Sequence, residues 1–135
     1  MSSPDNSIPA GVASSCLRHA AWVALLAEVS AIAWFATFGS IQQMQVQSFL
    51  MLGDKSAHML AFLAAGLTVS LAARSVIWPV FALSGMAGIV EVMQIFVPGR
   101  SASTSDFAAS LVGVAIGLAF GAVLWPILLR RRSRA

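Results

Sequence analysis

Four long apolar stretches constrain the fold of this chain more than any other feature. They cover about residues 20–38, 54–73, 76–97 and 106–129, and a helix needs roughly 20 apolar residues to cross a bilayer. The composition agrees, since 59% of the 135 residues are hydrophobic and 10% are charged, which is too apolar for a soluble domain of this size. We therefore predict an all-α membrane protein, a four-helix transmembrane bundle.

Glycine, proline and acidic residues mark where these helices should begin and end. Gly39 follows the first stretch and Pro98-Gly99 follows the third. Glycine and proline at these positions favour the end of a helix. Asp54 and Asp106 stand at the starts of the second and fourth stretches and are predicted N-cap residues. The third helix is expected to run to about residue 97.

The remaining segments are predicted to lie outside the bilayer. Residues 1–18 contain prolines and serines without apolar periodicity and are expected to form a flexible N-terminal tail. Residues 40–53 mix glutamines with apolar side chains, a pattern typical of a segment at the membrane interface. The chain thus divides into the tail, a transmembrane domain over residues 19–129 and a basic tail over residues 130–135.

Lysine and arginine are distributed unevenly between the two ends of the predicted bundle. Arg18, Arg74 and the four arginines of residues 130–135 fall on one side of four crossings, while Lys55 and Arg100 fall on the other. The positive-inside rule then predicts that both termini are cytoplasmic, in the inner (cytoplasmic) membrane of the cell. With no other basic surface, the expected partners of the tail are membrane lipids and not nucleic acid.

The fourth apolar stretch carries glycines at intervals of four. Gly113, Gly117 and Gly121 would leave one helix face as bare backbone, which lets a neighbouring helix approach closely. The second stretch has a stripe that could match this face, formed by His58, Ala61, Ala65, Thr68 and Ala72. We therefore expect the second and fourth helices to face one another, with His58 and Asp106 at the same outer level.

Glu91 is the polar residue that most needs an explanation. A charge at the bilayer centre costs about 2.5 to 3.5 kcal/mol on insertion scales, and Glu91 would lie about 9 Å inside the end of a helix that ran to residue 97. Gln94 falls on the same face one turn later. The carboxyl could be a protonated or paired group that fixes helix register, or it could take part in ligand binding or chemistry. Glu28, near the middle of the first helix, has no evident partner in the sequence, and its role stays open.

Asp54 and His58 are spaced four residues apart at the start of the second helix. The carboxylate could therefore hold the imidazole in one orientation and tautomer, which would make His58, Glu91 and Asp54 the candidate catalytic residues. The alternative is that Asp54 is a helix cap and His58 an interfacial side chain.

Further polar residues map to the same outer ends of consecutive helices. The candidate ligand-binding residues are Lys55, Gln94, Arg100, Asp106 and Ser110. The two cations could hold a phosphate or carboxylate headgroup, or the cluster could be a closed network of near-balanced charges. One histidine with scattered carboxylates, and Cys16 as the single cysteine, lack the compact spacing of a metal site, so neither a metal nor another cofactor is predicted.

In this order, these residues resemble the VanZ-like family of membrane proteins. The resemblance covers about residues 20–128 and rests on Asp54-Lys55-Ser56-Ala57-His58, Glu91-Val92-Met93-Gln94, Pro98-Gly99-Arg100, and Asp106 with Gly113. The chain departs from the family at Ser110, where the family commonly has asparagine, so the amide donors of that position are lost. The family is named for a protein linked to teicoplanin resistance, which implies a role at the cell envelope without identifying a reaction.

Two functions from different classes are consistent with these features. The first is an accessory protein that binds an envelope lipid headgroup or a glycopeptide-type ligand at the outer face through Lys55, Arg100 and His58. The second is an intramembrane hydrolase or transferase acting on a lipid-linked substrate, with Asp54 and His58 as an oriented acid or base and Glu91 as a second carboxyl. The loop after the third helix offers hydroxyls but no recognisable nucleophile motif, so water would have to attack.

Overall fold

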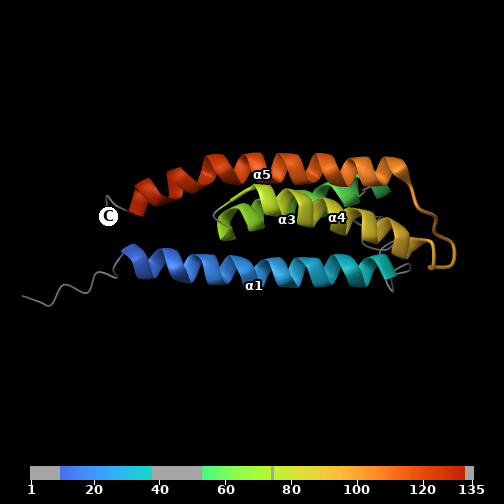
Figure 1. The fold of residues 1–135 in the computed structure, drawn as a ribbon, viewed down its shortest axis with the longest axis horizontal. Helices are drawn as coiled ribbons and strands as arrows, with labels where there is room; N and C mark the ends of the chain where they lie inside the picture. The colour runs from blue at the N-terminus through green and yellow to red at the C-terminus, as the bar shows by residue number, and fades with distance from the viewer. Residues whose placement is uncertain (1–9, 38–52, 74, 133–135) are drawn as a thin grey trace, which may run out of the picture.

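The computed structural model describes residues 10–37, 53–73 and 75–132, and within these ranges the fold consists of four helices (Figure 1). They are α1 (Ala10–Thr37), α3 (Asp54–Ala72), α4 (Ile77–Gln94) and α5 (Thr104–Arg132). Each contains a span long and apolar enough to cross a membrane. These spans confirm the predicted all-α fold with four candidate transmembrane helices.

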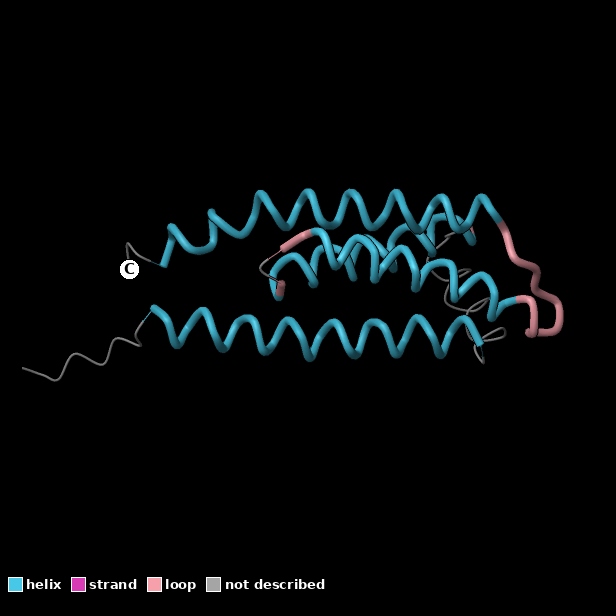
Figure 2. The backbone as a smooth tube through the Cα atoms, in the orientation of Figure 1, coloured by secondary structure: helices cyan, strands magenta, loops and turns pink. Residues whose placement is uncertain are grey.

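The helices run side by side along one long axis. In Figures 1 and 2, α1 and α5 lie on opposite sides, with α3 and α4 between them in this view. The start of α1 and the end of α5 lie at the same end of the bundle, as an even number of crossings requires. We call this the termini end, and the opposite end, with the loop between α4 and α5, the loop end. That the termini end is cytoplasmic stays a prediction.

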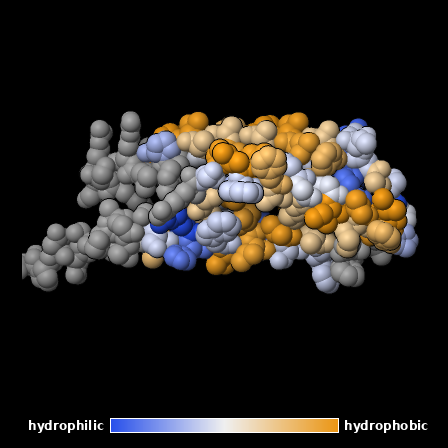
Figure 3. Space-filling view, in the orientation of Figure 1, coloured by the Kyte–Doolittle hydropathy of each residue, from blue (hydrophilic) through white to orange (hydrophobic). Residues whose placement is uncertain are grey.

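The surface of the bundle has the polarity that a membrane solvent requires. On the face drawn in Figure 3, apolar residues cover the middle of the molecule and hydrophilic ones gather near its two ends. Large apolar side chains such as Trp78, Phe81 and Phe120 are each more than half exposed. In water this exposure would be costly, whereas hydrocarbon tails solvate such side chains.

The α3–α5 contact is a close approach of two backbones. A Cβ atom at Gly113 would overlap the carbonyl oxygen of Met59, and one at Gly117 would overlap that of Leu63. On the other helix, a Cβ at Gly66 would lie 2.9 Å from the carbonyl oxygen of Val114. The two helices therefore pack through facing glycines, as small residues permit, which confirms that these two helices face each other.

The residues of α3 that meet α5 differ from the predicted stripe. Met59, Leu63, Gly66 and Ser70 lie against the α5 glycines, whereas Thr68 donates a hydrogen bond to Glu28 of α1. The stripe prediction is wrong for Thr68 because the α3 residues that contact the α5 glycines lie on another face of α3.

Both predicted N-caps are displaced from the positions that the sequence indicated. The cap of α3 is Gly53, and Asp54 lies in the first turn, where its charge is still favourable to the helix dipole. In α5, which begins at Thr104, the hydroxyl oxygen of Ser103 accepts the N–H of Asp106 at 3.3 Å. Ser103 therefore performs the capping role predicted for Asp106.

Two helix boundaries also differ from the prediction. α4 ends at Gln94 rather than near residue 97. Residues 95–99 continue as turns in which Gly99 has a φ of 79°, a value that glycine adopts without strain. α1 begins at Ala10, so the second half of the expected flexible tail is helical, because extending a helix costs less than nucleating one. The predicted interfacial segment 40–53 lies almost wholly outside the described residues.

We predict that Gly117→Ala lowers the free energy of unfolding by about 1 to 3 kcal/mol, the usual cost of overpacking a filled contact. Its Cβ would meet the backbone of α3, with the Leu67 nitrogen at 2.8 Å. Gly85→Ala is the matched control, because nothing lies within 4 Å of a Cβ at that position. Unfolding of both variants in detergent, followed by circular dichroism, checks this. Equal stability of the two variants would contradict the close contact.

Candidate functional site

His58 is the centre of a buried polar cluster near the loop end of the bundle. It lies one turn into α3, and its side chain is 8% exposed. Its Nδ1 atom lies 3.3 Å from the hydroxyl oxygen of Ser110 on α5, which is fully buried. This contact is possible because the facing Gly66 and Gly117 bring the two backbones together about two turns farther along both helices.

The hydrogen bonds of Ser110 determine which nitrogen of His58 carries the proton. The Ser110 hydroxyl donates to the backbone oxygen of Asp106 at 3.0 Å, so its oxygen can act toward His58 only as an acceptor. Nδ1 of His58 must then be the donor. In the neutral imidazole this leaves Nε2 without a proton and with a lone pair, able to accept a hydrogen bond or a proton.

Glu91 of α4 joins the same cluster from a second side. Its Oε1 atom lies 3.8 Å from Nδ1 of His58, and its Oε2 atom accepts the backbone N–H of Ser103 at 2.7 Å. Oε1 is buried and has no hydrogen-bond partner among the described residues. A buried carboxyl oxygen that accepts no hydrogen bond costs free energy unless it is protonated, paired with a cation or bound to a ligand.

The depth of Glu91 is smaller than the sequence suggested. Because α4 ends at Gln94, Glu91 lies three residues from the helix end, which corresponds to about 4.5 Å and not about 9 Å. The segment between α4 and α5 folds back over this end and supplies the Ser103 amide. Ser103 is therefore a site residue by its backbone, a role that side-chain chemistry in the sequence could not reveal.

Arg100 and Asp54 form a separate ion pair at the same end of the bundle. Arg100 Nη2 lies 3.8 Å from Asp54 Oδ1, with side chains 14% and 54% exposed. Because the Asp54 carboxylate is half exposed, solvent screens the attraction, and we expect the pair to contribute about 1 kcal/mol or less. Lys55, the neighbour of Asp54, is exposed. The predicted cations thus lie at the rim of the cluster and not in its buried centre.

A pocket of about 280 Å³ opens beside His58, between α1, α3 and α4. We call it the His58 pocket. Its polar lining residues are Glu28, His58 and Gln94, and the apolar ones include Ile32, Phe35, Phe62 and Val90. Its volume is just below the range of about 300 to 1,000 Å³ typical of small-molecule sites, so it can hold part of a ligand.

Glu28 has the partner that the sequence did not reveal. Its Oε1 atom accepts the Thr68 hydroxyl proton at 2.9 Å, while its Oε2 atom is buried without a hydrogen-bond partner in the described part of the chain. Glu28 therefore brings an incompletely satisfied carboxyl to the His58 pocket. The signal in the sequence was the glutamate itself, at a depth where an isolated charge is costly.

The structure unites some of the predicted site residues and separates others. His58, Glu91 and Ser110 meet directly, and Asp106 takes part through its backbone oxygen, while its side chain accepts from Ser105 at 3.4 Å. Gln94 lines the His58 pocket and is 3% exposed. In the ranges that the structure describes, no group of three or more His, Cys, Asp or Glu side chains is placed to hold a metal ion.

The comparison with protein families identifies the family of the chain. The family model described as VanZ/LLP1 matches residues 9–129, a range that includes every residue of the His58 cluster. The chain belongs to the VanZ/LLP1 family. Searches among curated proteins and among solved structures give no match. The match establishes a VanZ-type membrane protein. It does not specify the chemistry of the polar cluster around His58.

The direction of the hydrogen bond between His58 and Ser110 gives a spectroscopic prediction for this VanZ-family protein. In a ¹⁵N-histidine-labelled His19→Gln variant, where His58 is the remaining histidine, we expect neutral His58 to be protonated at Nδ1. Ser110→Ala removes one acceptor of that proton, so the Nδ1–H fraction should fall. The ¹⁵N chemical shifts of the two ring nitrogens measure this. A neutral ring protonated at Nε2 in the unmodified Ser110 background would contradict the assignment.

Proposed function

We propose that this VanZ/LLP1-family protein binds an envelope lipid at the loop end of the bundle. Part of the hydrocarbon would occupy the His58 pocket, and a polar group of the lipid would meet His58 and Gln94. The observation that carries the proposal is that Glu28 Oε2, which is buried without a hydrogen-bond partner among the described residues, belongs to an apolar-walled pocket that His58 and Gln94 also line. That combination is typical of sites that orient a mostly apolar ligand through a few polar contacts.

The polar groups of the pocket favour a ligand with hydrogen-bond donors as well as acceptors. Nε2 of neutral His58 and Oε2 of Glu28 can both accept, and the Gln94 amide can donate and accept. A hydroxyl, amine or amide on the ligand would satisfy the buried Glu28 oxygen, which otherwise remains costly. A headgroup rich in hydroxyls or amides therefore suits the His58 pocket better than a bare hydrocarbon does.

The rim cations supply a contact for an anionic part of the same headgroup. Arg100 is paired with Asp54 through one long contact of 3.8 Å, and Lys55 is exposed beside it. A phosphate or carboxylate could exchange with the Asp54 carboxylate on the Arg100 guanidinium, whose planar donors suit such anions. A glycopeptide-type ligand carries a comparable mixture of hydroxyl, amide and carboxylate groups, and a role in antibiotic resistance at the cell envelope would follow.

A second candidate function is acid–base chemistry on a lipid-linked substrate, as a hydrolase or transferase. The observation that favours it is the inferred proton on Nδ1 of His58, which leaves Nε2 able to accept a proton from water or a substrate hydroxyl. Glu91 at 3.8 Å would stabilise the imidazolium that forms. In this mechanism water is the nucleophile, and His58 returns the proton to the leaving group.

Filling the His58 pocket should prevent lipid binding. We expect Ala61→Phe to reduce, by about tenfold, the amount of envelope lipid that stays bound to the purified protein in native mass spectrometry, because Ala61 lines the pocket. Gln94→Leu should reduce it by a smaller factor, since it removes one buried hydrogen-bonding group and keeps the volume. Ala115→Phe, at an exposed position of α5 that lines neither described pocket, is the matched control.

Equal lipid retention by Ala61→Phe and Ala115→Phe would contradict the binding proposal. The same variants separate binding from catalysis when the protein is incubated with a lipid-linked diphosphate and release of the headgroup is followed. Turnover that His58→Gln abolishes, while the lipid remains bound, would favour the enzyme. Binding without turnover by any variant would leave the accessory role as the function.

A further inference from the structure

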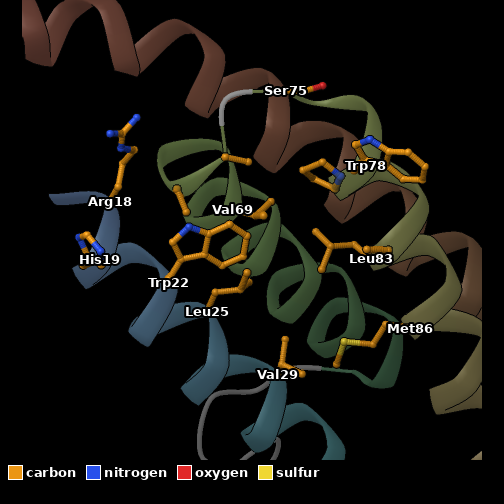
Figure 4. A pocket seen from close by; sticks show the side chains of 14 residues that line it. Arg18, His19, Trp22, Leu25, Val29, Val69, Ser75, Trp78, Leu83 and Met86 are labelled. Atoms are coloured by element: carbon orange, nitrogen blue, oxygen red, sulfur yellow. The ribbon is translucent and has the colours of Figure 1, made fainter. Parts of the chain in front are cut away.

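A second and larger pocket lies at the termini end, away from the His58 cluster. Its volume is about 750 Å³, and it is an open pocket lined by α1, α3, α4 and residues between α3 and α4 (Figure 4). We call it the Arg18 pocket. Arg18 and Ser75 stand near one end of it and Val29 and Met86 at the other, with Trp22 of α1 pointing inward between them. The proposed function at the His58 pocket does not use this space.

The walls of the Arg18 pocket suit a hydrocarbon chain. Away from Arg18 they are formed by apolar side chains such as Leu25, Val69, Leu83 and Met86. Two tryptophans, Trp22 and Trp78, line the end nearer the polar residues. Tryptophan prefers the level of the lipid headgroups, where its ring is in contact with hydrocarbon and its N–H with polar groups.

The length of the Arg18 pocket matches one leaflet of a bilayer. Along α1 it extends from Arg18 to Val29, eleven residues that rise about 16 Å. The hydrocarbon core is about 30 Å thick, so one leaflet contributes about 15 Å. An acyl chain that entered beside Arg18 would therefore end near the middle of the membrane, where the lining of the Arg18 pocket stops.

The polar end of the Arg18 pocket has the charge and the donors for a phosphate. Arg18 has no carboxylate partner among the described residues, and no acidic residue lines the pocket. The hydroxyl oxygen of Ser75 accepts the Ile77 N–H at 3.3 Å, which leaves its proton free to donate. His19 already donates its Nδ1 proton to the Ser15 carbonyl at 2.8 Å, so Arg18 supplies the fixed charge.

We propose that the Arg18 pocket is a binding site for an anionic phospholipid of the leaflet at the termini end. One acyl chain lies between Trp22 and Leu83, and the phosphate is bound by the Arg18 guanidinium and the Ser75 hydroxyl. Such a lipid would fill the space between α1 and the α3–α4 pair and tie α1 to the bundle. This site is independent of the ligand proposed for the His58 pocket.

Brominated lipids that quench tryptophan fluorescence test the site in the full-length protein. A Trp34→Phe/Trp125→Phe background keeps Trp22 and Trp78, the tryptophans of the Arg18 pocket, as reporters. The protein is reconstituted in vesicles with equal mole fractions of brominated phosphatidylglycerol or brominated phosphatidylcholine. We expect the apparent association constant for the anionic lipid to be about tenfold higher, as one charge-assisted contact provides.

Two variants and two controls distinguish specific binding in the Arg18 pocket from the general attraction of anionic lipids to a basic protein. Arg18→Gln should abolish the preference for phosphatidylglycerol, while Lys55→Gln, which removes a charge near the other end, should preserve it. Ala82→Phe should also reduce the preference, because Ala82 lines the Arg18 pocket, whereas Ala115→Phe should not.

The proposal is overturned if Arg18→Gln keeps the preference, or if Arg18→Gln and Lys55→Gln reduce it equally. It is also overturned if residues of the N-terminal segment occupy the pocket instead of lipid. In that case quenching by both lipids is low in the full chain and rises when residues 2–9 are deleted.

Discussion

The backbone contact between α3 and α5 is the interaction on which the rest of the structure depends. Gly66, Gly113 and Gly117 leave no side chain between the two helices. Because the axes are so close, a residue as short as Ser110 can reach the imidazole of His58 across the interface. A larger residue in place of either α5 glycine would move the helices apart and place Ser110 out of reach of His58.

The polar cluster follows from the lack of water in the surrounding solvent. In a bilayer core each polar group must find its partner within the protein, and the buried polar side chains of α3, α4 and α5 converge for that reason. The convergence is incomplete, since one oxygen each of Glu28 and Glu91 has no partner in the described ranges. Glu28 lines the His58 pocket, and Glu91 lies next to His58, which also lines it. Unused hydrogen-bonding capacity beside a pocket supports the proposed ligand site over a network that only holds helices together.

Much of the fold could be predicted from the sequence because membrane spans depend on length and hydropathy, which are local properties. The glycine spacing also indicated the pairing of α3 with α5. The detailed site could not be predicted to the same degree. The end of α4 at Gln94 changed the depth of Glu91, and the Ser103 amide that binds it belongs to the backbone, which carries no sequence signal. The Glu28–Thr68 contact depends on the rotation of α3 about its own axis. The predicted stripe placed Thr68 toward α5, and the structure places it toward α1.

Ser110, at a position where the resemblance to the VanZ-like family predicts asparagine, fits the same geometry. Full burial leaves little room at this position, and the hydroxyl both donates to Asp106 and accepts from His58. The amide donors that serine lacks are thus not needed for this contact. The cluster retains an acceptor for the imidazole, which is the property that the proposed acid–base chemistry requires.

We infer that His58 and Glu91 persist inside the bundle because each offsets part of the burial cost of the other. A double-mutant cycle with His58→Leu, Glu91→Leu and the double variant measures this directly, as free energies of unfolding in detergent micelles. Removal of one partner leaves the other buried and unpaired. We therefore expect the sum of the two single-variant losses in unfolding free energy to exceed the loss in the double variant by about 1 kcal/mol or more. Additive losses would contradict the account.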